Sequence, residues 1–143
     1  MYDIYAPIIP RVGMGGFLLN MSKQEAEKVL GYPLGDGENM HNGAWKKYMI
    51  DDALTLFFSV QQNKLKAIET EKDYKGLVLG RIGTSTDEAD LLRLDPTLVY
   101  DEFEEVYESK EHHYQIETCL PEEKARWISI STEDWSESRM IDQ

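Results

Sequence analysis

The chain has 143 residues, and its 41% hydrophobic and 10% aromatic side chains are enough for a folded core, which argues against a disordered polypeptide. It carries 15 basic and 27 acidic residues, a formal net charge of -12. This charge disfavours nucleic acids and anionic membrane surfaces as ligands and favours a basic protein partner, although an acidic surface can also serve solubility alone.

The N-terminal residues 1–7 contain no basic segment followed by an apolar stretch, so they do not resemble a secretory signal. The longest apolar run, at 53–60, is too short to cross a bilayer. Cys119 is the only cysteine, so no intramolecular disulfide can form. We therefore expect a cytoplasmic protein with no membrane association.

The first expected helix begins at a capping box. Ser22 can accept a hydrogen bond from the Glu25 backbone N–H, while the Glu25 side chain reaches back to the Ser22 backbone. Apolar side chains follow on one face, Gly31 suits a left-handed C-terminal cap, and Pro33 prevents continuation. The pattern predicts a short, half-buried helix.

The pattern then changes to period two, which predicts strands at 45–50, 53–60 and 65–70, joined by polar turns. A helix followed by such a series gives an antiparallel meander with a helix to cover one face. The predicted class is therefore α+β.

A diverged second copy of this series follows. Ser85-Thr86-Asp87-Glu88 repeats the capping box of Ser22 to Glu25, and Asp95-Pro96 ends the second helix. The spacing between copies is about 63 residues at the helix and about 62 in the strands, where Ile116, Thr118 and Leu120 match Leu54, Leu56 and Phe58. We expect one domain, 1–143, made of repeats at about 14–75 and 76–132, with a loose polar tail at 133–143 that could hold a helical turn.

The repeated unit contains the motif Gly-apolar-x-Leu-x-Met-Ser-x-x-Glu at 16–25, Leu-Gly-x-Pro at 30–33, and Trp45 with Tyr48 before two apolar strands. In these features it resembles the unit of the beta-lactamase inhibitor protein-like fold, which small lipoproteins of the outer-membrane barrel-assembly machinery share. It implies that the two copies join into one curved antiparallel sheet, covered by helices on one face and open to a target protein on the other.

We expect the protein to differ from the secreted and lipidated members of that group, because residues 1–7 show no leader pattern and Cys119 alone cannot form a disulfide pair. A small, very acidic cytosolic protein of this build looks more like an immunity protein paired with a contact-dependent bacterial toxin. The expected partner is therefore a cognate toxin, basic in charge, whose active or substrate-binding site the protein occludes. The expected oligomeric state stays open.

Strand alternation predicts which side chains lie on the open face. One set faces the helices: Leu54, Leu56, Phe58, Ile68, Ile116, Leu120, Ile128 and Ile130. The other set faces away from them: Thr55, Phe57, Ser59, Glu117, Trp127 and Ser129. Exposed aromatics among polar residues are typical of binding hot spots, so Phe57 and Trp127 are candidate anchors unless the tail or a dimer partner covers them.

The second candidate is the stretch 99–108, which fits either a helix or a strand. Carboxylates there could meet lysines and arginines of a toxin, and the aromatics could supply contact area. A solvated charged face is the alternative. The candidate residues are Tyr100, Asp101, Glu102, Phe103, Glu104, Glu105, Tyr107 and Glu108.

Two other functions remain as alternatives. One is a structural or assembly module of the barrel-assembly lipoprotein type. The other is a small enzyme with Cys119 as nucleophile and His113 as base, although no oxyanion loop or third catalytic residue is recognisable. No cofactor is implied, and no zinc or calcium motif is present. We expect a binding protein rather than an enzyme.

Overall fold

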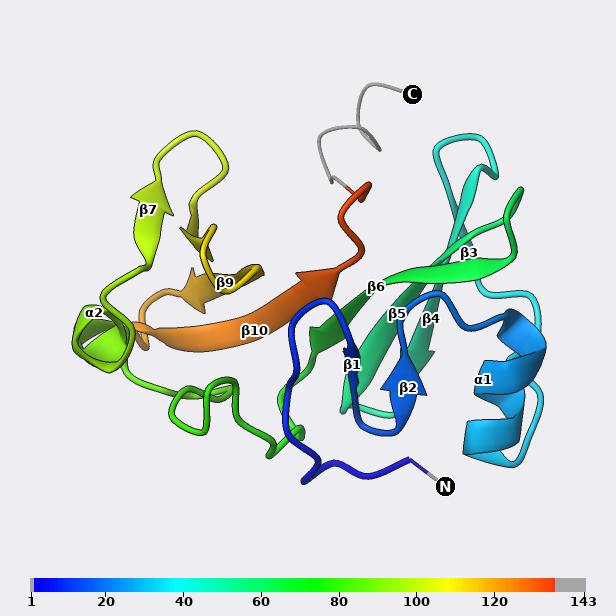
Figure 1. The fold of residues 1–143 in the computed structure, drawn as a ribbon, viewed down its shortest axis with the longest axis horizontal. Helices are drawn as coiled ribbons and strands as arrows, with labels where there is room; N and C mark the ends of the chain where they lie inside the picture. The colour runs from blue at the N-terminus through cyan, green and yellow to red at the C-terminus, as the bar shows by residue number, and fades with distance from the viewer. Residues whose placement is uncertain (1, 136–143) are drawn as a thin grey trace.

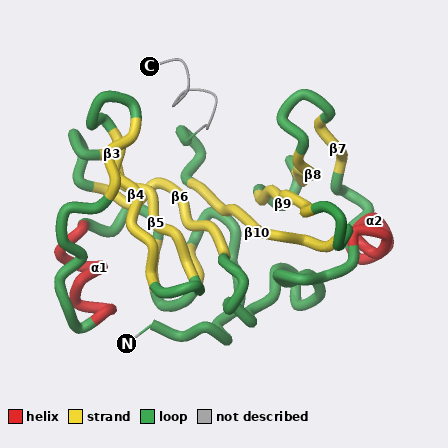
Figure 2. The backbone as a smooth tube through the Cα atoms, turned by 180° about the vertical axis from the view of Figure 1, so that it is seen from behind, coloured by secondary structure: helices red, strands yellow, loops and turns green. Residues whose placement is uncertain are grey.

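The computed structural model describes residues 2–135 and shows an α+β protein dominated by one open antiparallel sheet of eight strands (Figure 1). The strand order is β3-β4-β5-β6-β10-β9-β8-β7. A separate two-stranded hairpin, β1 (Gly13–Met14) and β2 (Phe17–Leu18), precedes the sheet in the chain. The two short α-helices lie near opposite ends of the molecule (Figure 2).

Helix α1 (Lys23–Leu30) confirms the first capping box. The Ser22 hydroxyl accepts from the Glu25 N–H at 3.1 Å, and the Ser22 N–H donates to the Glu25 carboxylate at 2.9 Å. Gly31 ends the helix at φ 85°, a left-handed conformation that glycine adopts without steric cost. Ala26 and Leu30 point into the core.

The three strands predicted after α1 are confirmed as β4 (Trp45–Ile50), β5 (Leu54–Ser59) and β6 (Lys64–Thr70). A short strand, β3 (Glu38–Met40), which the sequence did not indicate, pairs with β4 and forms one edge of the sheet. The β5–β6 register shifts between Phe57 and Phe58, so Lys66 is the extra residue of a bulge in β6.

The second half contains the 3-10 helix η1 (Glu88–Asp90), α2 (Leu91–Leu94), and four strands. The second capping box is wrong: η1 begins after Asp87, and no side chain caps it. Ser85 instead has φ 82° and donates its backbone N–H to Ala125 at 2.8 Å. The strands are β7 (Val99–Asp101), β8 (Val106–Ser109), β9 (Tyr114–Cys119) and β10 (Lys124–Ser131).

The two halves join where β6 pairs with β10. Their four-strand series run outward from this seam in matching order, as two joined copies would. The turn between β5 and β6 is closed by the pair Ser59 and Lys64, and the turn between β9 and β10 by the pair Cys119 and Lys124. These turns are 60 residues apart, whereas the sequence match placed the copies about 62 residues apart in the strands. Because strand side chains alternate with period two, this difference leaves the assignment of faces unchanged. The repeat itself stays a prediction, because a shared strand order is weaker evidence for two copies than backbones that superpose.

One buried hydrophobic cluster lies on one face of the sheet and spans both halves. Of the residues expected there, seven are buried, but Leu120 is wrong: it lies in the turn after β9 and is 82% exposed. The helices supply only part of the cover. The N-terminal segment and the loop at 71–86 add the remaining buried groups, among them Ile8, Met14, Phe17, Leu19, Tyr74, Val78 and Ile82.

The start of the predicted loose tail is docked, because Trp135 packs on the sheet. The rest of that tail, 136–143, with its possible helical turn, lies outside the described residues. Among residues 2–135, no helix has the length and apolarity needed to cross a membrane.

Candidate binding surface

The stretch 99–108 is a β-hairpin, so its helical interpretation is wrong. Its turn is held by Asp101, whose side chain accepts the N–H groups of Phe103 and Glu104 at 2.9 and 3.1 Å. The Glu105 N–H donates to the Asp101 carbonyl at 2.7 Å. Asp101 is therefore a turn-forming residue, and Phe103, 92% exposed, projects from the tip.

The hairpin divides the predicted acid-aromatic stretch between two faces. Tyr100 and Tyr107 form a cross-strand pair with ring centroids 5.0 Å apart, on the side of η1, and the Tyr107 hydroxyl donates to Glu88 at 2.8 Å. Glu108 lies on the opposite face, where its carboxylate accepts from the Gln115 amide at 3.1 Å. Tyr107 is therefore directed away from Glu108 and towards η1, whereas Tyr100 also lines a hollow that contains Phe103 and Glu108.

Burial and the bonded Glu88 carboxylate raise the pKa of Tyr107 to about 12. The tyrosine is therefore a neutral hydrogen-bond donor at physiological pH. Its hydrogen bond to Glu88 joins β8 to η1 and so helps to fix the orientation of the hairpin.

The tip carries unpaired negative charge. Glu102, Glu104 and Glu105 are exposed, and within the described part of the chain no lysine or arginine forms a salt bridge with any of them. The tip therefore presents an aromatic ring between carboxylates that are free to meet an external cation.

A buried polar network anchors the base of the hairpin. Asp95, buried at the end of α2, accepts from the backbone N–H and hydroxyl of Thr97 at 3.0 and 2.6 Å and from the Tyr114 hydroxyl. The Thr97 hydroxyl also lies 2.7 Å from that of Ser109. Burial alone would raise the pKa of Asp95, but the Thr97 and Tyr114 donors outweigh it and lower the pKa. The same burial and hydrogen bond raise the pKa of Tyr114.

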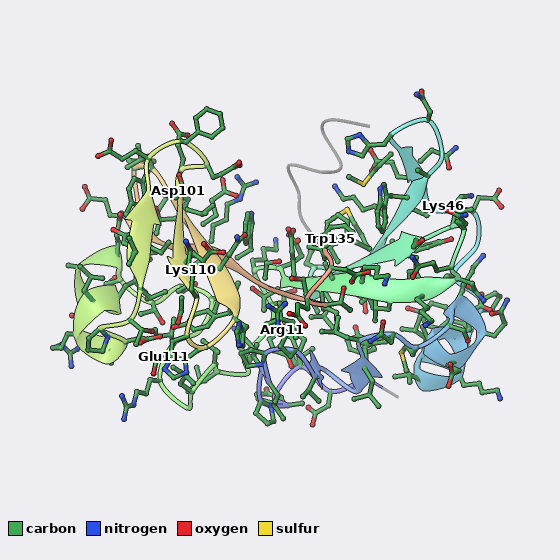
Figure 3. The ribbon with its side chains drawn as sticks, turned by 45° about the horizontal axis from the view of Figure 1, so that its top comes forward. Arg11, Lys46, Asp101, Lys110, Glu111 and Trp135 are labelled. Carbon is green, nitrogen blue, oxygen red and sulfur yellow. The ribbon has the colours of Figure 1, made fainter. Side chains whose placement is uncertain are left out.

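A groove of about 500 Å³ lies beside the hairpin on the open face (Figure 3). Its acidic lining residues are Asp101, Glu104, Glu108 and Glu133. Its basic lining residues are Arg11, Lys110 and His113, and Trp135 also borders it. A second hollow, of about 740 Å³, lies along β7 and includes Phe103 in its wall. The two hollows share Asp101, Glu108 and Lys110, so both lie against the hairpin and give a partner concave surface beside it.

The basic side of the groove was missed from the sequence. Arg11, in the loop between Ile9 and Gly13, donates to the Ser131 carbonyl at 3.1 Å and lies 3.4 Å from the Nδ1 of His113. These contacts span more than 100 residues of chain, and no local pattern around Arg11 signals them.

Phe57 lies on the predicted face, but the prediction that it is exposed is wrong. It is 5% exposed, because the Trp135 ring covers it at a centroid distance of 5.6 Å. Thr55 is also buried and donates to Glu71 at 2.8 Å. Cover by the tail, one of the two alternatives left open, is therefore what the structure shows.

The second-half residues predicted on this face are more accessible. Trp127 and Glu117 are paired across β10 and β9, and both are partly exposed. Glu117 lies 4.0 Å from the Arg126 guanidinium. Both side chains remain available to a partner.

The thiol–imidazole pair is not assembled. His113 lies in the turn before β9 and Cys119 at the end of β9, about 20 Å apart at the usual rise per residue. Cys119 contacts the Lys124 carbonyl, and His113 contacts Arg11. A nucleophile and its base must lie within hydrogen-bond reach, so this geometry does not support that mechanism.

Within residues 2–135, no three histidine, cysteine, aspartate or glutamate side chains gather in a group able to hold a metal ion. Comparisons of the chain with protein-family models, curated proteins and solved structures found no match. The likeness to the beta-lactamase inhibitor protein-like fold therefore stays a prediction.

Proposed function

We propose that this protein is a stoichiometric inhibitor that binds a basic protein, an immunity protein for a bacterial toxin in the cytoplasm. The observation that carries the proposal is Phe103, 92% exposed at the tip of a hairpin and flanked by carboxylates without salt-bridge partners in the described chain. An exposed aromatic ring costs solubility, and a binding role accounts for its position.

Binding would begin with charge. A formal net charge of -12 attracts a basic protein over a distance and raises the rate of encounter. The Phe103 ring would then enter an apolar pocket of the partner, with Glu102, Glu104 and Glu105 meeting lysines or arginines around it. A partner held in this way and filling the groove beside the hairpin would have its own basic active or substrate-binding surface covered.

The organisation of the chain supports the same proposal. We infer that the two halves are diverged copies of one helix-and-four-strand unit, since their strands run outward from the β6–β10 seam in matching order. Superposition of residues 23–70 on residues 88–131 tests this inference. Unrelated backbone paths would contradict it.

The proposal is tested by affinity capture from the native host with three baits: wild type, Phe103→Ala and Leu120→Ala. Leu120 is a matched control, because it is an equally exposed apolar residue at a different turn. We expect wild type and Leu120→Ala to retain one basic protein, and Phe103→Ala to bind it at least about 30-fold more weakly, as for a hot-spot residue. Equal retention by all three baits would contradict the role of the hairpin.

The captured protein then decides the class of function. Expressed alone in a bacterial host it should arrest growth, and co-expression of this chain should restore growth at a 1:1 complex. A captured component of the outer-membrane barrel-assembly machinery would instead support the assembly-module alternative.

A further inference from the structure

The open face of the first half carries an aromatic shelf, formed by Trp45 and Phe57, that the chain covers with its own Trp135. The Trp135 ring meets Trp45 edge-on at 4.8 Å between centroids and lies 5.6 Å from the Phe57 ring. Trp135 is itself only half buried. The shelf is therefore an apolar surface that Trp135, which still contacts solvent, helps to cover.

A buried cation lies beside the shelf. Lys66, at the bulge of β6, is 4% exposed, and its ammonium group donates to the Asp134 carboxylate at 3.0 Å. A lysine this buried needs a carboxylate, because an unpaired charge is costly away from water. The shelf and Lys66 together therefore fit a segment in which an acidic residue directly precedes an aromatic one, as Asp134 precedes Trp135.

One polar atom of the shelf lacks a partner. The indole Nε1 of Trp45 is sealed from solvent, and among the described residues no acceptor lies within hydrogen-bond distance of it. Buried donors are nearly always paired, so this N–H marks a place where a bound segment could supply an acceptor that the chain's own segment does not.

The segment that covers the shelf is a small preformed turn. The Thr132 N–H donates to the Lys66 carbonyl at 2.9 Å, the Thr132 hydroxyl to Asp134 at 2.6 Å, and the Trp135 N–H to the Thr132 carbonyl at 3.2 Å. The bond from Thr132 to the Lys66 carbonyl and the Lys66–Asp134 pair join the turn to the sheet. The turn follows the end of β10 at Ser131, so it can leave the shelf without disrupting that strand.

We propose that the shelf and Lys66 form a docking site for a short segment of a partner protein in which a carboxylate precedes an aromatic residue. In the free protein Asp134 and Trp135 occupy this site, and the partner segment takes their place. Trp135 also borders the groove beside the hairpin, so its departure joins the groove to the shelf. This second surface does not depend on the Phe103 hairpin.

A synthetic peptide of residues 131–138, Ser-Thr-Glu-Asp-Trp-Ser-Glu-Ser, is the probe. It is titrated by calorimetry into three full-length proteins: wild type, Asp134→Ala/Trp135→Ala, and Leu120→Ala. In the double variant the site is vacant, so its apparent Kd should be at least about tenfold lower than that of wild type, in which the attached segment competes. Leu120→Ala should behave as wild type, because Leu120 is an exposed apolar residue in the turn after β9, at the other end of β10 from Asp134 and Trp135.

Two altered peptides test the chemistry of the site. Replacement of the tryptophan by alanine, or of the aspartate by asparagine, should weaken binding to the double variant by about tenfold or more. Equal affinity of all peptides, or of all three proteins, would overturn the proposal.

A measurement on unmutated protein covers the case in which the double variant does not fold. Fluorotryptophan-labelled wild type is titrated with the peptide, and the fluorine resonance of Trp135 should move to its solvent-exposed position. A resonance that stays in place at saturating peptide would contradict displacement. Concentration-dependent dimers in which Trp135 stays covered would assign the site to a second copy of this chain instead.

Discussion

Single residues in this protein take their roles from partners that are distant in the chain. Asp101 was expected to contact a toxin, yet its carboxylate is used by the N–H groups of its own turn. Phe57 was expected to be an exposed anchor, yet Trp135 covers it. Phe103 keeps its predicted availability, because a four-residue turn gives its side chain nothing to pack against.

The Asp95 network predicts a pH dependence of stability. The folded-state pKa of Asp95 is lowered, so its contribution is present above the unfolded value of about 3.9 and is lost as the pH falls through the folded value. At pH 7, Asp95→Asn should lower the free energy of unfolding by about 2 kcal/mol, and this deficit should shrink at pH 3.

Urea denaturation at pH 7, 5 and 3 measures this effect. Glu122→Gln is the control, because Glu122 is exposed in a turn. The difference in unfolding free energy between this variant and wild type should be the same at all three pH values. A deficit of equal size at pH 3 would show that Asp95 acts through packing rather than through its charge.

At the scale of elements, the same Ser-x-x-Glu pattern has two outcomes. Ser22 caps α1, whereas residues 85–88 pair with β10 and its preceding turn: the Ala125 N–H donates to the Thr86 carbonyl at 2.7 Å and the Glu88 N–H to the Glu123 carbonyl at 2.8 Å. The Glu88 side chain also accepts from Tyr107 and is no longer free to close a capping box. Tertiary hydrogen bonds therefore prevail over the local cap, which is worth about 1 kcal/mol.

This difference predicts the effects of two matched substitutions. Ser22→Ala should cost about 1 kcal/mol of unfolding free energy, because it removes the cap of α1. Ser85→Ala should change stability by less than about 0.5 kcal/mol, since the backbone N–H of Ser85 makes its tertiary bond. Thermal unfolding of both variants measures the contrast, and equal losses would mean that Ser85 caps the second helix in solution.

At the scale of the whole molecule, the seam between β6 and β10 makes one structure of two halves. Ile68 and Ile130 are paired across it, and the Ile128 N–H donates to the Thr70 hydroxyl at 2.9 Å. The core cluster continues across the seam without a break in the described chain. Neither half has a separate core, so we expect the domain to unfold cooperatively.

Two core truncations test this cooperativity. Leu56→Ala in the first half and Ile116→Ala in the second should each cost about 2–5 kcal/mol, since both side chains are fully buried. Native-state hydrogen exchange should show that each change also lowers the protection of the most stable amides in the other half. Unchanged protection in the distant half would show that the halves unfold independently.

Local physics made much of the architecture predictable from the sequence. The capping box and Gly31 determine α1, period-two alternation determines β4, β5 and β6, and the alternation also assigned most side chains to the correct face. The combination of negative charge with an aromatic residue at the hairpin tip can also be read directly from the sequence of residues 102–105. These features depend on neighbours within a few residues, which is why the pattern alone was sufficient.

The tertiary structure alone decided which candidate residues are accessible. Trp135 covers Phe57, Arg11 meets His113, and Ser85 bonds to Ala125, and each contact joins segments that only the completed sheet brings together. Exposure depends on what packs above a strand, and alternation specifies only the direction of a side chain. Of the two candidate surfaces, the Phe103 hairpin is exposed as predicted, whereas Phe57 in the middle of the sheet is covered by the chain's own Trp135.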